Sequence, residues 1–356
     1  MERAPVAVAM SGGVDSSVAA ALLARSGREV IGLTMRLGSA REEAEDAALA
    51  ARRVAGRLGI PHRVLDLGEE FRRLVLDGFA GEYARGRTPS PCVRCNSLLK
   101  FGVLLDRARA LGAETLATGH YAVLIRDARR GRTLLSRAAD RARDQSYFLF
   151  DLTEEQRCRA EFPLGRIRKE DVRSAAAEIG LEVAARPDSM DLCFLRRGED
   201  YRELLAREGK GAAGGPGEIV SVRGDALGRH GGIAGFTVGQ RRGLGLAAGR
   251  PLYVVRVEAA SRRVVIGEEG DLYSRSCTIE GVRWIPFDRP LGPLRATVKI
   301  RSSHSGAPAT VEDRGDGTAE VRFDEPQRAV APGQAAVAYE GDLVLGGGWI
   351  REAGPV

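Results

Sequence analysis

The chain has 356 residues, enough for two or three domains, and its 44% hydrophobic and 29% charged residues are typical of a globular protein. This balance excludes a wholly disordered or collagen-like chain. The 54 basic and 48 acidic residues give a formal net charge of +6. That excess fits an anionic partner such as nucleic acid, or equally an arginine-rich composition without functional meaning. Only four of the basic residues are lysines: Lys100, Lys169, Lys210 and Lys299.

Membrane and secretory features are not predicted. The longest early apolar run, residues 18–24, is far shorter than the roughly 20 residues of a spanning helix. The N-terminal stretch has no clear signal-peptide cleavage site. Five cysteines in a chain of this length do not make a disulfide framework. We therefore expect a cytoplasmic protein without membrane partners, whose closely spaced cysteines serve metal or redox chemistry.

The first half of the chain alternates strands and helices. Strands are predicted at residues 5–10, 29–35, 62–67 and 115–118, and helices at 16–25, 42–58, 71–83 and 98–111. Such alternation predicts a doubly wound α/β domain with a parallel sheet covered on both faces, spanning residues 1–205.

The second half is rich in short strands. Residues 206–217 read as a Gly- and Ala-rich linker, and residues 252–258 and 263–266 as a hairpin. Further strands are predicted at 296–301, 309–312, 319–323, 335–339 and 342–345, with a hairpin turn at Asp316-Gly317. We expect a small β-rich central domain at 206–275 and a C-terminal β-barrel at 276–356.

The first strand-to-helix turn carries the string SGGVDSS, residues 11–17. Gly12 and Gly13 leave room for a ligand, so that backbone N–H groups and the start of the next helix face an anion. No Gly-Lys-Ser/Thr follows, which excludes the lysine-containing P-loop. Asp15, on what we expect to be an exposed turn, would hold Mg²⁺ or orient a pyrophosphate. A plain strand–helix turn is the alternative, but the full string favours a phosphate site.

Two cysteines, Cys92 and Cys95, are spaced C-x-x-C after the Pro89-Ser90-Pro91 segment. We expect a loop here and a helix starting near residue 97, whose N-terminus would lower the thiol pKa. A single C-x-x-C is compatible with zinc, a redox pair, an iron–sulfur cluster or chance. Without a second C-x-x-C, a four-cysteine zinc site is not expected. Cys193 lies far along the chain and, taken alone, is more often a buried core thiol.

The string SGGVDSS resembles that of the pyrophosphatase-loop family, whose members cleave ATP between the α- and β-phosphates to adenylate a substrate. Nearly the whole chain is similar to the bacterial tRNA-specific 2-thiouridylases, in the order of that family. The further segments that carry the resemblance are GRTPSPCVRCNSLLKF (86–101), ATGHYA (117–122), RDQSYFL (143–149), FPLG (162–165), DSMDLCF (188–194), FTVGQRRGLG (236–245), PLYVV (251–255), FDEPQRAVAPGQAAVAY (323–339) and LGGG (345–348). The resemblance implies an adenine-nucleotide α-hydrolase-like domain, a small central domain and a β-barrel.

The resemblance also implies roles for single residues. ATP-binding positions are matched by Ala9, Met10, Ser11, Gly12, Gly13, Val14, Asp15, Ser16, Met35 and Gly119. Cys95 matches the catalytic nucleophile and Cys193 the persulfide-carrying cysteine. The segment beside the target base is matched by Ser90, Pro91 and Cys92, and other tRNA-contacting positions by His120, Arg143, Asp144, Gln145, Arg301, Ser302 and Gln334. A capping or core imidazole is the alternative for His120. The Arg241-Arg242 pair suits a phosphate contact or a solvated basic turn.

The implied reaction is 2-thiolation of the wobble uridine of tRNA, with ATP and Mg²⁺ activating the C2 oxygen. Two sulfur routes stay open. Cys193 carries a persulfide from a cysteine desulfurase relay and Cys95 resolves it, or Cys92, Cys95 and Cys193 hold a [4Fe–4S] cluster whose fourth iron binds sulfide. Many family members have Asp at position 92, where this chain has Cys92, so an acid–base role for a carboxylate at that position cannot apply here. The presence of Cys92 as a third cysteine slightly favours the cluster route. The rival hypotheses are an argininosuccinate- or GMP-synthetase-type ligase, and an RNA-binding protein with ATP as a structural ligand.

Overall fold

The computed structural model describes residues 4–38, 41–181, 193–195, 199–207, 215–246 and 249–355, without the side chains of 41–44. The chain divides into two compact units. The first comprises Met1–Val75, Cys92–Arg196 and Asp342–Val344, and the second Leu76–Pro91, Arg197–Gly341 and Leu345–Val356. Within the described ranges, no helix is both long and apolar enough to cross a membrane.

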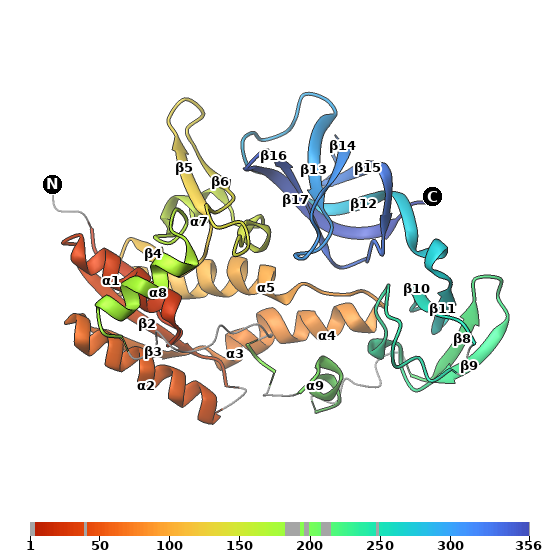
Figure 1. The fold of residues 1–356 in the computed structure, drawn as a ribbon, viewed down its shortest axis with the longest axis horizontal. Coiled ribbons are helices and arrows are strands. Elements are labelled where there is room, and N and C mark those ends of the chain that lie inside the picture. The colour runs from red at the N-terminus through yellow and green to blue at the C-terminus, as the bar shows by residue number, and fades with distance from the viewer. Residues whose placement is uncertain are drawn as a thin grey trace. The chain divides into compact units, whose positions relative to one another are not determined.

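The first unit is built on a five-stranded parallel sheet with the strand order β3-β2-β1-β4-β7, of which β2, β3 and β4 are labelled in Figure 1. The strands are β1 (Val6–Ala9), β2 (Val30–Arg36), β3 (His62–Asp66), β4 (Thr115–Ala117) and β7 (Ala160–Glu161). In the central strand, Val6, Ala7 and Val8 are fully buried, as a strand covered on both faces requires. The predicted parallel α/β architecture is confirmed.

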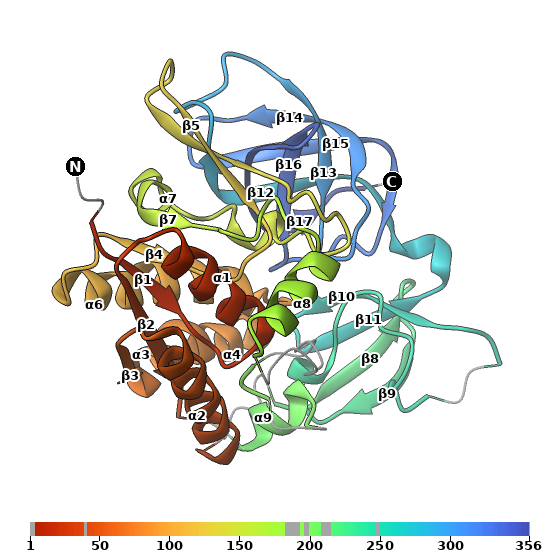
Figure 2. The ribbon, with the colours of Figure 1, turned by 60° about the vertical axis from the view of Figure 1, so that its left-hand side comes forward.

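Three helices share one hydrophobic core with β1. They are α1 (Val14–Arg25), α2 (Arg41–Leu58) and α8 (Lys169–Glu178), which contribute Val18, Ala51 and Val172 among others (Figure 2). A further helical run contacts β4 through its last segment and consists of α5 (Pro91–Arg94), the π-helix η2 (Cys95–Leu104) and α6 (Leu105–Ala110).

Two helices differ from the sequence-based expectation. The helix expected from residue 98 begins at Pro91, because proline suits the first turn of a helix, where its missing N–H is not needed. The C-x-x-C motif is therefore helical and does not lie on a loop. The helix expected at 71–83 consists of α3 (Gly68–Phe71), the π-helix η1 (Arg72–Leu76) and α4 (Asp77–Ala84).

Several elements of the first unit were not predicted. Strands β5 (Val123–Asp127) and β6 (Arg132–Ser136) form an antiparallel hairpin, visible in yellow in Figure 1. Next come the 3₁₀ turn η3 (Ser146–Leu149) and α7 (Glu154–Arg159). The N-terminus of α7 is fixed by a capping box between Thr153 and Gln156.

The second unit contains a four-stranded sheet of order β10-β11-β8-β9. Its strands are β8 (Gly217–Ser221), β9 (Ala226–His230), β10 (Tyr253–Glu258) and β11 (Arg263–Gly267), and the predicted β10–β11 hairpin is confirmed. Helix α9 (Tyr201–Arg207) extends into the predicted linker, of which residues 208–214 lie outside the described part of the chain.

The remaining strands close into a six-stranded barrel, which confirms the predicted barrel. The order is β12-β15-β14-β13-β16-β17, and β17 pairs with β12 to close the ring. The strands are β12 (Tyr273–Trp284), β13 (Leu294–Lys299), β14 (Ala307–Asp313), β15 (Thr318–Arg328), β16 (Ala335–Glu340) and β17 (Leu343–Ala353). Strand β12 was not predicted. The Asp316-Gly317 turn joins β14 to β15 as expected.

Candidate functional site

The Gly-rich loop between β1 and α1 has the geometry of an anion site. Gly12 has φ +73, and a Cβ on it would lie 2.5 Å from the carbonyl oxygen of Ala47, so only glycine fits. The Ser16 hydroxyl accepts a hydrogen bond from Ser11 N–H (3.1 Å) and donates to Gly13 O (3.2 Å). Gly13, the N-cap of α1, places no side-chain cap over the first turn. The loop is thus ordered, and the start of α1 is left for a ligand.

Gly119 packs directly against this loop. A Cβ at this position would lie 2.7 Å from the Ser16 nitrogen and 2.8 Å from the Asp15 carbonyl carbon. Gly119 follows β4, and half-buried Met35 lies near the end of β2. Both predicted ATP-binding positions therefore lie at the carboxyl edge of the parallel sheet, where open α/β sheets bind ligands.

Asp15 is held by two residues that sequence reasoning missed. The Lys169 ammonium lies 2.8 Å from each Asp15 carboxylate oxygen, and the Tyr121 hydroxyl donates to Oδ1 at 2.7 Å. The Lys169 side chain is 9% exposed and that of Asp15 31%. The expectation that Asp15 lies on an exposed turn is wrong, because the residue is in the first turn of α1 and anchors the start of α8.

The segment Arg143–Gln145 is tied to the same network. Gln145 Oε1 accepts a hydrogen bond from Tyr121 N–H (2.9 Å), and Gln145 N–H donates to Tyr121 O (2.8 Å). Asp144 Oδ1 accepts from Ala138 N–H and from Ser146 N–H. Asp144 and Gln145 thus stabilise a turn through these hydrogen bonds. Because the Tyr121 hydroxyl also binds Asp15, the predicted tRNA-contacting segment is connected to Asp15 through Tyr121.

The two motif cysteines lie one helical turn apart at the junction of α5 and η2. Because π-helical hydrogen bonds join residues i and i+5, η2 places Lys100 on the same face as Cys95. An α-helix would turn residue i+5 well away from residue i. Lys100 interacts electrostatically with Cys92, Cys95 and Cys193, so one ammonium serves all three thiols.

Burial raises the thiol pKa values at this position. The pKa of Cys95 rises to about 11, although the Lys100 ammonium opposes the shift. The pKa of Cys92 is also raised, first by burial. The expectation of a lowered pKa is wrong because Cys95 is 8% exposed and lies inside the helix, away from its N-terminus. Cys193 is exposed, and residues 188–192 of its motif lie outside the described ranges.

His120 is buried among aromatic rings, with Phe101 and Phe162 at centroid distances of 6.3 and 5.8 Å. Its Nδ1 lies 2.7 Å from the Thr118 hydroxyl. Burial, together with the Lys100 charge, holds its pKa well below the usual range. The ring is therefore neutral near pH 7, and this environment favours the core-imidazole alternative over a charged contact to phosphate.

In the second unit, Gln334 holds residues 88–89, which precede the cysteines in the sequence. Its amide nitrogen donates to the carbonyls of Thr88 and Pro89, both at 3.1 Å. Thr88 N–H donates to Pro332 O at 2.7 Å. Ser90 and Pro91 are buried. Gln334, a predicted tRNA-contacting residue, thus uses its side-chain nitrogen to fix residues 88–89.

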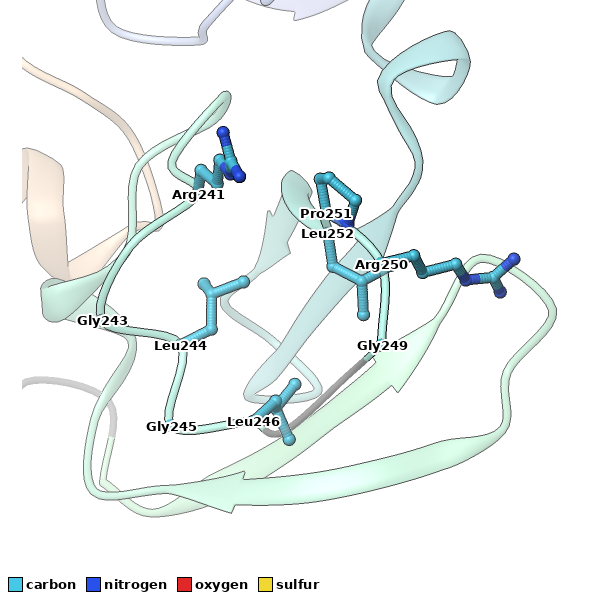
Figure 3. A pocket seen from close by; sticks show the side chains of 9 residues that line it. All are labelled: Arg241, Gly243, Leu244, Gly245, Leu246, Gly249, Arg250, Pro251 and Leu252. Atoms are coloured by element: carbon cyan, nitrogen blue, oxygen red, sulfur yellow. The ribbon is translucent and has the colours of Figure 1, made fainter.

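The other predicted basic contacts lie on turns of the second unit. Arg301 and exposed Ser302 follow β13, and Arg301 donates to Arg328 O at 3.3 Å. Exposed Arg241 and Arg250 line a pocket of about 670 Å³ and extend from different sides of it (Figure 3). Arg250 is paired with Glu268. An exposed arginine on a Gly-bounded turn suits a backbone phosphate.

One sequence signal pointed to the missed residues. Lysine is scarce in this arginine-rich chain, and two of the four lysines, Lys100 and Lys169, face the cysteines and the Gly-rich loop. Because a compact ammonium and a planar guanidinium differ in hydration and geometry, a rare lysine in an arginine-rich chain indicates a position where the two are not interchangeable.

Comparison with known proteins agrees with this geometry. The tRNA methyl transferase HUP domain matches residues 4–197, its PRC-barrel domain residues 205–268, and the aminomethyltransferase beta-barrel domain residues 274–350. Proteins named tRNA-specific 2-thiouridylase MnmA are similar over nearly their whole length. Those of Syntrophotalea carbinolica, Solibacter usitatus and Acidobacterium capsulatum are 50%, 47% and 48% identical, covering 97%, 99% and 97% of this chain and 98%, 100% and 98% of theirs. With this identity over almost the full length, the chain belongs to the tRNA-specific 2-thiouridylase family.

Proposed function

We propose that this protein catalyses the ATP-dependent 2-thiolation of the wobble uridine of tRNA. The observation that carries the proposal is the connected network Gln145–Tyr121–Asp15–Lys169, which joins the predicted tRNA segment to the Gly-rich loop. The same unit carries the C-x-x-C motif and Cys193. An adenylating loop and a set of thiols together suit sulfur transfer, whereas a plain ligase has no use for the thiols.

The first step activates the base. A wobble uridine must leave its stack to reach a buried pocket. With ATP on the loop, the uridine O2 attacks the α-phosphorus, the bond to the β-phosphate oxygen breaks, and pyrophosphate leaves. The N3 proton passes to solvent. Asp15, whose side chain is 31% exposed and is also bound by Lys169, is the carboxylate that would hold Mg²⁺ beside the phosphates, and the ion would neutralise phosphate charge when bound.

The second step transfers sulfur. The terminal sulfur of a Cys193 persulfide bonds to C2, and AMP departs. Cys95 Sγ then attacks Cys193 Sγ and breaks its bond to the transferred sulfur. The products are 2-thiouridine and a Cys95–Cys193 disulfide, which a thiol reductant reopens with two electrons. A cysteine desulfurase relay would supply the persulfide.

A [4Fe–4S] cluster does not fit the side chains as placed. Among the described residues, no three His, Cys, Asp or Glu side chains gather in a geometry that could hold a metal. No step of the mechanism therefore passes through a cluster, and the cluster is kept as the competing outcome of a test.

The test is reconstitution with purified protein, tRNA, ATP and a persulfide donor, read by mass spectrometry of nucleosides and by pyrophosphate release. We expect 2-thiouridine, and pyrophosphate release that depends on tRNA. Pyrophosphate release with citrulline or a similar small substrate, and none with tRNA, would instead assign a ligase.

Cys92→Ser separates the sulfur routes in the same assay. On the persulfide route, Cys92→Ser keeps substantial activity while Cys95→Ser and Cys193→Ser lose it. After anaerobic reconstitution with iron and sulfide, a brown wild type whose colour and activity both vanish in Cys92→Ser would establish the cluster route, because a hydroxyl is a poor iron ligand.

A further inference from the structure

Two helices begin at the same edge of the first unit. Helices α1 and α8 share a hydrophobic core. Arg57, in the last turn of α2, donates to the carbonyl of Ile179 at the end of α8 (2.9 Å), so the C-terminal ends of α2 and α8 are neighbours. At the other end, the first residue of α8, Lys169, meets Asp15 in the first turn of α1. The positive ends of two helix dipoles are therefore neighbours.

A basic pocket opens at the start of α8. It has a volume of about 580 Å³, within the range of small-ligand sites, and is lined by residues 139–143, 168–170 and 173. Its basic side chains are Arg141, Arg143, Arg168, Lys169 and Arg173, against the acidic Asp140 and Glu170. Arg141 is paired with Asp342, and Lys169 with Asp15. With these two carboxylates counted, five basic groups still exceed four acidic ones, so the pocket region keeps a net positive charge.

Asp140, one of the two acidic residues that line the pocket, already accepts hydrogen bonds from backbone groups. Asp140 Oδ2 accepts a hydrogen bond from Lys169 N–H (3.0 Å), and Oδ1 accepts one from Ala142 N–H (3.2 Å). Arg168, the N-cap residue of α8, is exposed and makes no capping hydrogen bond with its side chain. The guanidinium of Arg168 is therefore available to an anion in the pocket.

We propose that this pocket binds the β- and γ-phosphates of ATP and the pyrophosphate that they form. The inference rests on the proposed adenylation and extends it from the Gly-rich loop to a second group of residues. Lys169 is the link, because it lines the pocket and its ammonium reaches the loop carboxylate of Asp15. Arginine forks match phosphate oxygens with paired hydrogen bonds, which suits a compact anion of high charge.

The alternative occupant is the tRNA backbone, since Arg143 lies in a predicted tRNA-contacting segment. Pyrophosphate is favoured because the pocket adjoins the N-terminus of α1 through Lys169–Asp15, and the ATP phosphates extend from that loop. If the pocket binds pyrophosphate, substitutions in it should weaken ATP and pyrophosphate binding. If it binds the tRNA backbone, they should weaken tRNA binding instead.

The experiment is calorimetric titration of the full-length protein with ATP, inorganic pyrophosphate and AMP, plus tRNA binding at one fixed salt concentration. The variants are Arg168→Ala and Arg173→Ala. Arg166→Ala is the matched control for Arg168→Ala, because both arginines are exposed but Arg166 does not line the pocket. We expect each pocket variant to weaken ATP and pyrophosphate binding by about tenfold, the loss typical of one charged hydrogen bond. AMP binding should be unchanged, because AMP lacks the two outer phosphates.

Other outcomes overturn the proposal. Equal weakening of AMP would mean that the arginines support the loop rather than bind the outer phosphates. Unchanged pyrophosphate affinity with weakened tRNA binding would assign the pocket to tRNA. Because these are binding measurements on the resting protein, they do not depend on thiolation. Failure of the reconstituted reaction and failure of this proposal are therefore distinguishable.

Discussion

At the scale of single residues, the Asp15–Lys169 pair combines a ligand-binding and a structural role. Asp15→Asn should abolish pyrophosphate release, because it removes the carboxylate on the loop. It should also destabilise the fold by about 1–3 kcal/mol, since it leaves the largely buried Lys169 ammonium without its counter-charge. Urea unfolding and the release assay measure the two effects.

Lys169→Met serves as the control for that stability effect. The Asp15→Asn/Lys169→Met double variant has no buried ammonium without a counter-charge, so the free energy of unfolding should recover while pyrophosphate release stays lost. Full stability of Asp15→Asn alone would show that the pair does not hold α8 to α1.

Cys95 should react slowly in the resting protein. Its pKa of about 11 lies above the ordinary value of 9.0, so the thiolate fraction below pH 9 is about a hundredfold smaller than for a free cysteine. Alkylation of Cys95 by iodoacetamide should then rise about tenfold per pH unit and level off only near pH 11. Peptide mass spectrometry over pH 7–11 measures this.

The same titration affects stability, with a sign set by the raised pKa. The unfolded chain loses its Cys95 proton near pH 9.0 and the folded protein only near 11, so this residue's contribution to stability is fully present below pH 9 and declines above it. Lys100→Gln should slow alkylation further, whereas Lys100→Arg should preserve the rate. A plateau near pH 9 in the wild type would contradict the burial of Cys95.

At the scale of elements, the barrel segment around Gln334 sets the conformation of residues 88–89. Gln334→Ala removes both hydrogen bonds to those carbonyls. We expect thiolation to fall about tenfold or more, because small misplacement of a reacting group is costly, while ATP binding is unchanged. Gln327→Ala is the matched control, an amide of the same barrel that bonds His304 and Glu325. Equal losses in both variants would indicate general damage to the barrel.

Some helices and strands could be predicted from the sequence and others could not. Strand β1 and helix α1 were predictable because the apolar run and the Gly-Gly turn act locally, through burial and backbone freedom. The π-helix η2 was not, because its i→i+5 bonds differ little in local preference from α-helical ones and depend on the surrounding packing. Strand β12 mixes polar and apolar residues, and only its pairing with β15 and β17 makes it a strand.

Within the site, the same distinction holds. The loop string SGGVDSS is contiguous, so its residues could be named from the sequence. Lys169, Tyr121 and Lys100 act on residues that only the fold or an irregular helix brings near, and no spacing rule connects them. The cysteine pKa was mispredicted because the start of the helix was placed several residues too late.

At the scale of the whole molecule, the basic excess predicts salt-dependent binding. If arginines on the turns of the second unit neutralise phosphates, tRNA affinity should fall steeply as salt rises. Arg241→Ala and Arg301→Ala should each reduce the slope of log affinity against log salt by about one. Filter binding between 50 and 300 mM salt would measure it. A wild-type slope near zero would show that the arginine content is compositional.

The π-helical register of η2 bears on how this chain tolerates changes in length. Lys100 is five positions after Cys95. In a π-helix residues i and i+5 lie on the same face, as residues i and i+4 do in an α-helix. Deleting the exposed Leu98 (39%) would therefore allow a regular α-helix that keeps the thiol and the ammonium aligned. A shortened variant of this kind should retain its pairing, whereas a one-residue insertion at the same point would rotate the ammonium by about 100° away from the cysteine.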